Sequence, residues 1–189
     1  MFEIRIHGRG GQGVVTAAEL LSVAGFLDGE YAQAFPSFGS ERTGAPVVAF
    51  CRLSATPIRS HEPVLTPDAL IVQDPTLLHQ DTLLSGLRPR GYLLINSTHG
   101  LADLGVPALL DDLRAVTVPA TALAREHLGR PVPNVPLLGA FAALTERVSL
   151  TAILAAIARR FPPHIADGNQ RAAHAAYDAI MEVRRAQAM

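Results

Sequence analysis

The fold is decided by the stretch FEIRIHGRGGQGVVTAAELL, which occupies residues 2–21. Over residues 2–7, apolar side chains alternate with polar ones, which is the period of a β-strand with one buried face. Four glycines then fall within residues 8–13, and an apolar stripe of helical period follows over residues 14–24. A strand, a glycine-rich turn and a helix in this order predict the opening of a βαβ unit.

Outside this stretch, further strands and helices are predicted along the chain. The run ALIVQ at residues 69–73 is nearly continuous in apolar side chains, as in a strand of a parallel sheet buried on both faces. Helix candidates lie between the later strands, and from Asn134 onward the pattern is helical, with Ser149 as an N-cap and a last helix over residues 167–185. The other predicted strands are residues 31–35, 46–53, 91–96 and 115–118.

The order of these elements predicts an α/β fold. We expect a mostly parallel sheet with helices on both faces, a Rossmann-like opening βαβ unit and a helical C-terminal part. The length of 189 residues fits a single domain over residues 1–189, in which the helical part covers about 134–189.

Composition excludes several classes of function. The net charge is −1 and no basic block stands out, so we expect no nucleic-acid partner. All 16 cationic residues are Arg, which rules out a lysine Schiff base and a phosphate-binding loop with a Lys. Cys51 is the only cysteine, too few for an iron–sulfur cluster, and the seven histidines lack metal-ligand spacing. No apolar run is long enough for a membrane helix and no leader pattern is visible, so a cytoplasmic location is expected.

The glycine loop is the strongest local signal. Gly8, Gly10 and Gly13 satisfy the pattern G-x-G-x-x-G directly after a strand and before a helix. The free N–H groups at a helix N-terminus favour an anion such as a phosphate. A dinucleotide site also needs an acid at the end of the second strand, and the only nearby acid, Glu30, stands at its start. The alternative is that the glycines serve only a tight turn and close helix packing.

A second motif, SFGSERTGAP, spans residues 37–46. Loops after strand ends line the binding crevice of an open α/β sheet, so we expect this loop near the glycine turn. Ser37 and Ser40 can donate hydrogen bonds, and Arg42 can hold a phosphate or carboxylate in a bidentate way. The alternative is a loop held by a Glu41–Arg42 pair and a subunit contact.

No residue stands out as a catalytic nucleophile. Ser97, His99 and Asp103 are close in sequence, but no nucleophile elbow accompanies them, so we interpret them as loop residues. Cys51 lies within an apolar strand and is predicted to be a core residue.

Read together, these motifs resemble the gamma subunit of pyruvate and ketoisovalerate ferredoxin oxidoreductases, within the 2-oxoacid oxidoreductase family. The resemblance covers essentially the whole chain. One departure is Thr43, where the family usually shows Arg, and it removes a charge from the second loop. The segments that carry the resemblance are IHGRGGQGVVTAAELL (6–21), AFPSFGSERTGAPV (34–47), IVQDPTLL (71–78), LLGAFAALTERVSLTAILAAIARRF (137–161) and GNQRAAHAAYDA (168–179).

The resemblance implies an enzyme that decarboxylates a 2-oxo acid on thiamine diphosphate, passes two electrons through iron–sulfur clusters and transfers the acyl group to coenzyme A. It places thiamine diphosphate, Mg²⁺ and the clusters on partner subunits of alpha, beta and delta (ferredoxin-like) type, with an NAD-linked reductase subunit as a further candidate partner. The gamma chain is then inactive alone and helps to bind coenzyme A. The identity of the 2-oxo acid and the choice of ferredoxin or NAD as acceptor stay open.

Combined with the motifs, the resemblance points to a coenzyme A site at the two loops. We expect the amides of the glycine turn to face its phosphates while the second loop approaches from the side. The alternatives are a free-standing Rossmann-like nucleotide-binding protein and a purely structural scaffold subunit. The candidate residues are Gly10, Gly11, Gln12, Gly13, Ser37, Ser40 and Arg42.

Overall fold

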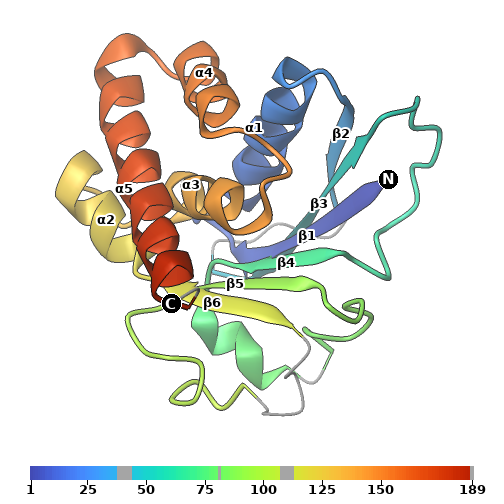
Figure 1. The fold of residues 1–189 in the computed structure, drawn as a ribbon, viewed down its shortest axis with the longest axis horizontal. Helices are drawn as coiled ribbons and strands as arrows, with labels where there is room; N and C mark the ends of the chain where they lie inside the picture. Colours follow the sequence, from blue (N-terminus) through green and yellow to red (C-terminus); the bar gives the residue numbers. More distant parts are fainter. Residues whose placement is uncertain (38–43, 81, 107–112, 188–189) are drawn as a thin grey trace.

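The computed structural model describes residues 1–37, 44–80, 82–106 and 113–187, and these form one layered α/β body (Figure 1). Its centre is a six-stranded sheet in the order β2-β3-β1-β4-β5-β6. The strands are β1 (Phe2–Arg9), β2 (Tyr31–Pro36), β3 (Pro46–Ser54), β4 (Ala69–Val72), β5 (Tyr92–Asn96) and β6 (Arg114–Val118). The helices are α1 (Val14–Leu27), the 3-10 helix η1 (Pro75–His79), α2 (Ala120–Leu128), α3 (Asn134–Thr145), α4 (Leu150–Arg160) and α5 (Pro163–Gln187).

The sheet is mostly parallel, as predicted. β1 pairs in parallel with β4, β4 with β5, and β5 with β6. β3 pairs antiparallel with both β1 and β2, so β3 alone runs against the other five strands. The opening βαβ unit is therefore present in a split form, because β3 lies between its two parallel strands.

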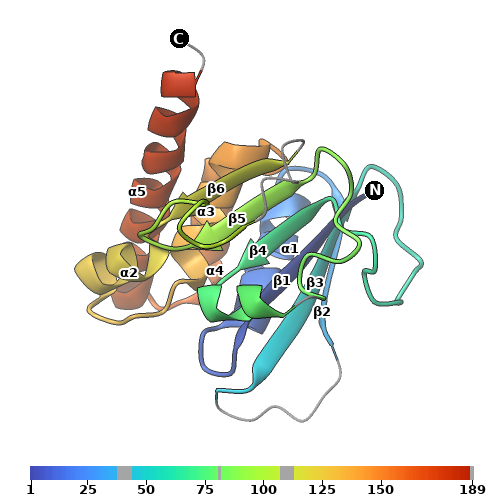
Figure 2. The same ribbon diagram turned by 90° about the horizontal axis from the view of Figure 1, so that it is seen from below.

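The two faces of the sheet are covered unequally (Figure 2). On one face, α1, α3, α4 and α5 enclose the larger core, which includes Ile4, Ile6, Ile71 and Phe141. The other face carries η1 and irregular segments around a smaller core. The predicted helices between the later strands are thus reduced, in the described residues, to η1 and turns. After η1, Gly86 at a φ of +78° and Pro89 interrupt the segment between β4 and β5 and prevent a longer helix.

The helical layer is held together by small residues. α3 lies in its middle, with every residue except Leu144 buried, and it packs most closely against α5. A Cβ atom on Gly139 would lie 1.9 Å from the backbone oxygen of Ala173, so only glycine permits this approach of α3 to α5. Ser149 caps α4 as predicted, its side chain accepting a hydrogen bond from the amide of Ala152 at 3.0 Å.

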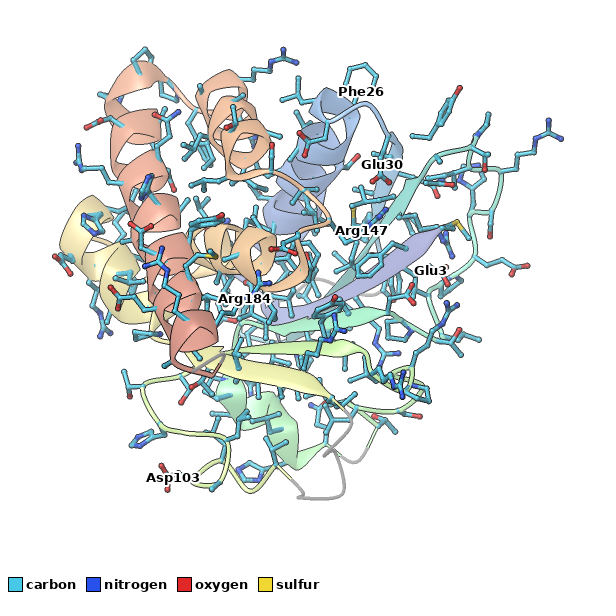
Figure 3. All side chains as sticks on the ribbon, in the orientation of Figure 1. Glu3, Phe26, Glu30, Asp103, Arg147 and Arg184 are labelled. Carbon is cyan, nitrogen blue, oxygen red and sulfur yellow. The ribbon has the colours of Figure 1, made fainter. Side chains whose placement is uncertain are left out.

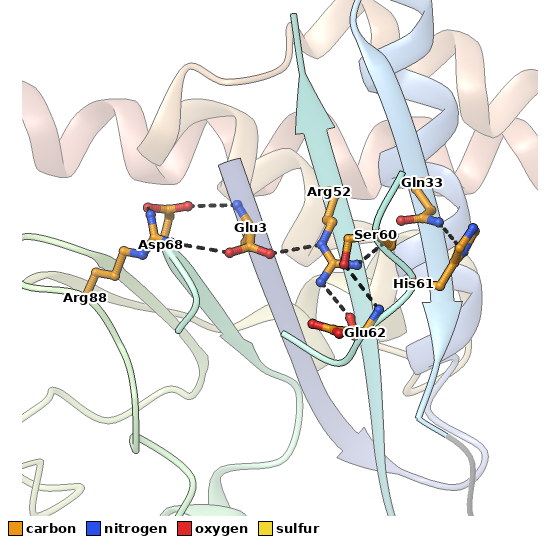
Figure 4. A network of polar contacts seen from close by, with 8 residues as sticks. All are labelled: Glu3, Gln33, Arg52, Ser60, His61, Glu62, Asp68 and Arg88. Carbon is orange, nitrogen blue, oxygen red and sulfur yellow. Dashed lines mark hydrogen bonds and ion pairs between the residues drawn. The ribbon is translucent and has the colours of Figure 1, made fainter. Parts of the chain in front are cut away.

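A polar network closes the sheet at the edge where β1 begins (Figure 4). Glu3 accepts a hydrogen bond from the buried Nε of Arg52 at 2.9 Å and pairs with Arg88 at 3.3 Å. The Arg52 guanidinium also donates to the backbone oxygens of Ser60 and Glu62, and the amide of Glu3 donates to Asp68. The network fixes the β3–β4 connection against the sheet, at the edge opposite the glycine turn.

No helix in the described part of the chain is long and apolar enough to cross a bilayer.

The fit of α3 against α5 yields a stability prediction. Replacing Gly139 by Ala should lower the free energy of unfolding by about 3 kcal/mol, because the added methyl group meets backbone that cannot move aside. Urea denaturation followed by circular dichroism measures the change. Gly100→Ala is the matched control: its Cβ would meet nothing closer than 3.7 Å, and its effect should stay within about 0.5 kcal/mol. Equal effects of the two substitutions would refute the packing interpretation.

Candidate functional site

The glycine turn lies at the sheet edge where the parallel strands end, which is where open α/β sheets bind ligands. It connects β1 to α1, and Gly11 and Gly13 adopt φ values of +96° and +72°, which favour glycine. Gly13 is the N-cap of α1 and provides no side-chain hydrogen bond to it. The first amides of α1 therefore have no partner from a cap or from the helix itself.

The four amides of the predicted site are not equivalent. The amide of Gly10 donates to the oxygen of Ala45 at 2.9 Å, and that of Gln12 donates to the oxygen of Arg9 at 3.0 Å. These two amides are used to build the turn and cannot also face a ligand. Of the four, the amides of Gly11 and Gly13 have no such backbone bond among the described residues, so they are the donors that a phosphate would meet, together with the N-terminus of α1.

The side chain of Gln12 is also engaged within the protein. Its Oε1 accepts from the amide of Arg9 at 2.8 Å, and its Nε2 donates to Oδ2 of Asp74 at 3.0 Å. Gln12 therefore acts as a brace between the turn and the residue that follows β4. Sequence reasoning placed Gln12 among the ligand contacts because it belongs to the glycine turn. Its structural role was not visible there, because the partner of its side-chain amide, Asp74, is 62 residues away.

Asp74 is the residue that sequence reasoning missed. Besides Gln12, its carboxylate binds Nε of Arg9 at 3.2 Å and accepts from the amide and hydroxyl of Thr76 at 3.0 and 2.6 Å. Burial raises the pKa of Asp74, but hydrogen bonds from Thr76 and Gln12 and the charge of Arg9 outweigh it, so the pKa lies below its usual value. An acid directly after a buried parallel strand was the available signal.

The second loop meets the glycine turn, as its position after β2 predicted. The amide of Gly44 donates to the oxygen of Gly10 at 3.2 Å, and Nη1 of Arg9 donates to the oxygen of Gly44 at 3.1 Å. Ser37 follows β2 directly and its amide donates to the oxygen of Val48 at 2.8 Å. The other two candidates of this loop, Ser40 and Arg42, lie outside the described residues.

His7 lies beneath the turn on β1. Burial, with Arg5 beside it, lowers the pKa of His7 to about 4, so the imidazole is neutral at neutral pH. Its Nε2 is buried and has no hydrogen-bond partner among the described residues. His7 therefore adds no positive charge to the site at neutral pH.

Glu30 does not serve a dinucleotide. It precedes β2, at the edge of the sheet away from the glycine turn, and both its oxygens accept from Nη2 of Arg147 at 2.8 and 2.9 Å (Figure 3). Its carboxylate thus ties β2 to the α3–α4 connection. Because β3 also separates β2 from β1, the described residues do not reproduce the acid and strand arrangement of a dinucleotide-binding unit.

The remaining candidates have structural roles. Cys51 is fully buried in the larger core, and burial, with a smaller effect of Glu30, raises the pKa of its thiol, which makes the thiol unreactive. Ser97 accepts from the amide of His99 at 2.9 Å, and Asp103 from the amide of Gly100 at 3.3 Å, so these side chains stabilise a loop as predicted. The described residues contain no cluster of His, Cys, Asp or Glu arranged to hold a metal ion.

Comparison with known proteins gives matches along nearly the whole chain. Residues 3–179 match the family described as pyruvate ferredoxin/flavodoxin oxidoreductase. The pyruvate synthase subunit PorC of Methanothermobacter thermautotrophicus is 44% identical over 97% of this chain and 98% of its own length. The pyruvate/ketoisovalerate oxidoreductases common subunit gamma of Pyrococcus furiosus is 42% identical over 94% and 96%. The crystal structure of pyruvate oxidoreductase subunit PORC from Thermotoga maritima superposes with a TM-score of 0.80, 37% identity and coverage of 94% and 95%.

The contacts of Asp74 yield a prediction with a pH dependence. Asp74→Asn should lower the free energy of unfolding by about 1–3 kcal/mol at pH 7, because the charge-assisted bonds to Arg9, Gln12 and Thr76 weaken. The folded-state pKa is depressed, so the stabilisation is complete above the unfolded value of 3.8 and is lost as the pH falls toward the folded value. Urea denaturation at several pH values should therefore show the two proteins converging below that pH. Glu19→Gln, at an exposed position of α1, is the control and should change little.

Proposed function

This chain belongs to the pyruvate ferredoxin/flavodoxin oxidoreductase family, and from that membership we propose that it is the gamma-type subunit of a 2-oxoacid oxidoreductase. The observation that carries the proposal is the extent of the match: the alignment with the archaeal PorC subunit covers 97% of this chain and 98% of the relative. The two chains therefore correspond over nearly their whole lengths. The assembled enzyme would convert a 2-oxo acid and coenzyme A to acyl-CoA and CO₂, with the two electrons passing to an acceptor such as ferredoxin.

The composition of the chain supports the proposal that the redox cofactors are bound by other subunits. Cys51 is the only thiol and lies buried in the core, whereas an iron–sulfur cluster typically needs about four cysteine ligands. In this proposal the clusters, thiamine diphosphate and its Mg²⁺ are held by partner subunits of alpha, beta and delta type. The bound thiamine would supply the carbanion chemistry of decarboxylation. The present chain would supply binding surface and part of the wall of the active site.

We further propose that coenzyme A meets this chain at the glycine turn. The geometry supports a narrower set of contacts than the sequence motif: the amides of Gly11 and Gly13 and the N-terminus of α1 would face its phosphates. Ser37 stands at the end of β2, two strands from β1 in the sheet, and Ser40 and Arg42 follow it in the chain. Arg9 cannot take that role with its full charge, because it is already paired with Asp74.

The alternatives differ from this proposal in testable ways. A free-standing nucleotide-binding protein would purify alone, and the engagement of Glu30 by Arg147 weighs against it. A scaffold subunit without a ligand would assemble with partners and leave coenzyme A binding unchanged when the second loop is altered. Purification and coenzyme A titration therefore separate the three.

The proposal predicts how the chain behaves by itself. Expressed without partners, it should contain no iron and show no oxidation of 2-oxo acids by a low-potential acceptor dye. Purified from its native source, it should appear with coloured, iron-containing partner chains. Stoichiometric iron in the isolated chain, measured by metal analysis, would overturn the proposed division of labour.

The second prediction concerns Arg42. In the assembled enzyme, Arg42→Ala should weaken coenzyme A binding by about tenfold to a hundredfold, because one charge-assisted contact of about 1.5–3 kcal/mol is lost. The measurement is a titration of coenzyme A, with subunit composition checked by gel filtration. Arg59→Ala, an exposed arginine at the opposite edge of the sheet, is the matched control and should leave the affinity unchanged. Unchanged affinity with intact assembly would exclude a direct contact, and dissociation would indicate that Arg42 belongs to a subunit interface.

A further inference from the structure

A cavity opens on the helical face of the glycine turn. Its volume is about 390 Å³, within the range of small-molecule sites of about 300–1,000 Å³. Gly11 and Gly13 form one side of it. The other sides come from the end of α2 and the linker that follows it, the start of α3, the end of α4 and the first turns of α5. Five separate parts of the chain therefore converge on this space.

The cavity is lined by cations from three of these parts. Arg130 belongs to the linker after α2, Arg160 ends α4, and Arg171 lies on α5. His127 and His164 add imidazoles to the same wall. None of the described residues that line the cavity is Asp or Glu. The lining residues therefore include several cationic side chains and no acidic one.

Ion pairing within the described residues leaves most of this charge uncompensated. Arg171 pairs with Asp167 one turn earlier on α5. Arg160 stacks over the ring of Phe161 at 5.6 Å, which positions its guanidinium without neutralising it. Arg130 is exposed and forms no ion pair among the described residues. Two of the three arginines therefore remain available to an anion, in the bidentate geometry that suits phosphate.

The backbone at the cavity is of mixed polarity, because α1 and α3 begin there while α2 and α4 end there. A Cβ on Gly13 would lie 2.4 Å from Nδ2 of Asn134, so the N-terminal ends of α1 and α3 are brought together at this wall. Asn134 holds that contact with a 3.3 Å hydrogen bond to the oxygen of Gly13. A Cβ on Gly168 would lie 2.7 Å from the oxygen of His127, so α5 begins directly against the end of α2. The N-termini of α1 and α3 carry partial positive charge, which adds to that of the arginines, whereas the C-terminal ends of α2 and α4 carry partial negative charge that His127 and Arg160 offset.

A structural role accounts for only part of this arrangement. His127 and Arg160 lie in the last turns of α2 and α4, where a cation stabilises the helix dipole. That effect does not explain Arg130, which lies beyond the αL cap of α2 at Gly129. Nor does it explain why cations from different segments surround one open space.

We propose that this cavity binds the phosphoryl groups of a small-molecule ligand, held by Arg130 and Arg160, with Arg171 beside them and paired to Asp167. The inference shares the glycine turn with the proposed coenzyme A site, but it adds side chains outside the second loop, so Arg160→Gln tests it separately from Arg42→Ala. The phosphoryl groups can come from coenzyme A itself or from a separate phosphorylated metabolite, and the same chemistry recognises both.

The test is calorimetric titration of the full-length chain with pyrophosphate. The unaltered chain should bind it, with an affinity that falls as salt is raised. Arg130→Gln and Arg160→Gln should each weaken binding by about tenfold, as expected for the loss of one charge-assisted contact. Arg159→Gln is the matched control, because it removes the same charge from the neighbouring exposed position of α4, outside the cavity. Circular dichroism confirms that each variant is folded.

Each possible outcome of these titrations leads to a different conclusion. Absence of pyrophosphate binding, or equal losses in Arg159→Gln and Arg160→Gln, would overturn the inference. If binding is found, a competition titration identifies the source. Displacement of pyrophosphate by coenzyme A, with coenzyme A also weakened by Arg160→Gln, would assign the phosphoryl groups to coenzyme A. Binding of pyrophosphate that coenzyme A does not affect would assign the cavity to a separate phosphorylated ligand.

Discussion

The carboxylate of Asp74 is the point on which the geometry of the candidate site depends. It receives hydrogen bonds or ion pairs from the last residue of β1, from the glycine turn and from the start of η1. Without these contacts, the turn would have to be fixed by its own backbone, which two φ-positive glycines make flexible. Asp74 holds the side chain of Gln12 in place. Gly11, which lies between Gly10 and Gln12 in the turn, then has an amide without a backbone partner among the described residues. A side chain two positions after the end of β4 thus determines which amides of a distant turn can bind an anion.

The uneven distribution of helices follows from side-chain size. Gly139 and the alanines of α5 let two helices approach until backbone touches backbone, so one face of the sheet accommodates four helices in a dense layer. The other face is closed by η1, loops and buried arginines such as Arg52, whose guanidinium needs Glu3 and backbone oxygens to offset its desolvation. That face therefore combines a smaller apolar core with polar contacts, whereas the helical face is held mainly by apolar burial.

The sequence predicted the bounds of the strands better than the contacts that their side chains make. The strands begin and end within about two residues of their predicted bounds, because each is a short apolar run flanked by turn-forming or polar residues. The antiparallel direction of β3 was not predicted, although the connection from β2 covers residues 37–45 and is shorter than the dozen residues that a parallel crossover needs. Gln12 could not be assigned, since a side-chain amide binds whatever the fold places beside it, and Asp74 is 62 residues away. The cavity was hidden for the same reason: its arginines are dispersed between residues 130 and 171.

The glycine turn belongs to two surfaces at once, and this limits what glycine substitutions can reveal. Gly13 places an amide at the sheet edge and lines the cavity. Its backbone oxygen also accepts a hydrogen bond from Asn134, which positions the start of α3. A side chain there would strike Asn134 at 2.4 Å and would also be strained at a φ of +72°, so the loss of any one property would accompany the loss of the others. The arginines can be varied separately, because their guanidinium groups are carried on long side chains and the backbone at these positions is held by other contacts. Charge at this site can therefore be varied without altering the backbone that presents it, and only such variants distinguish binding from folding.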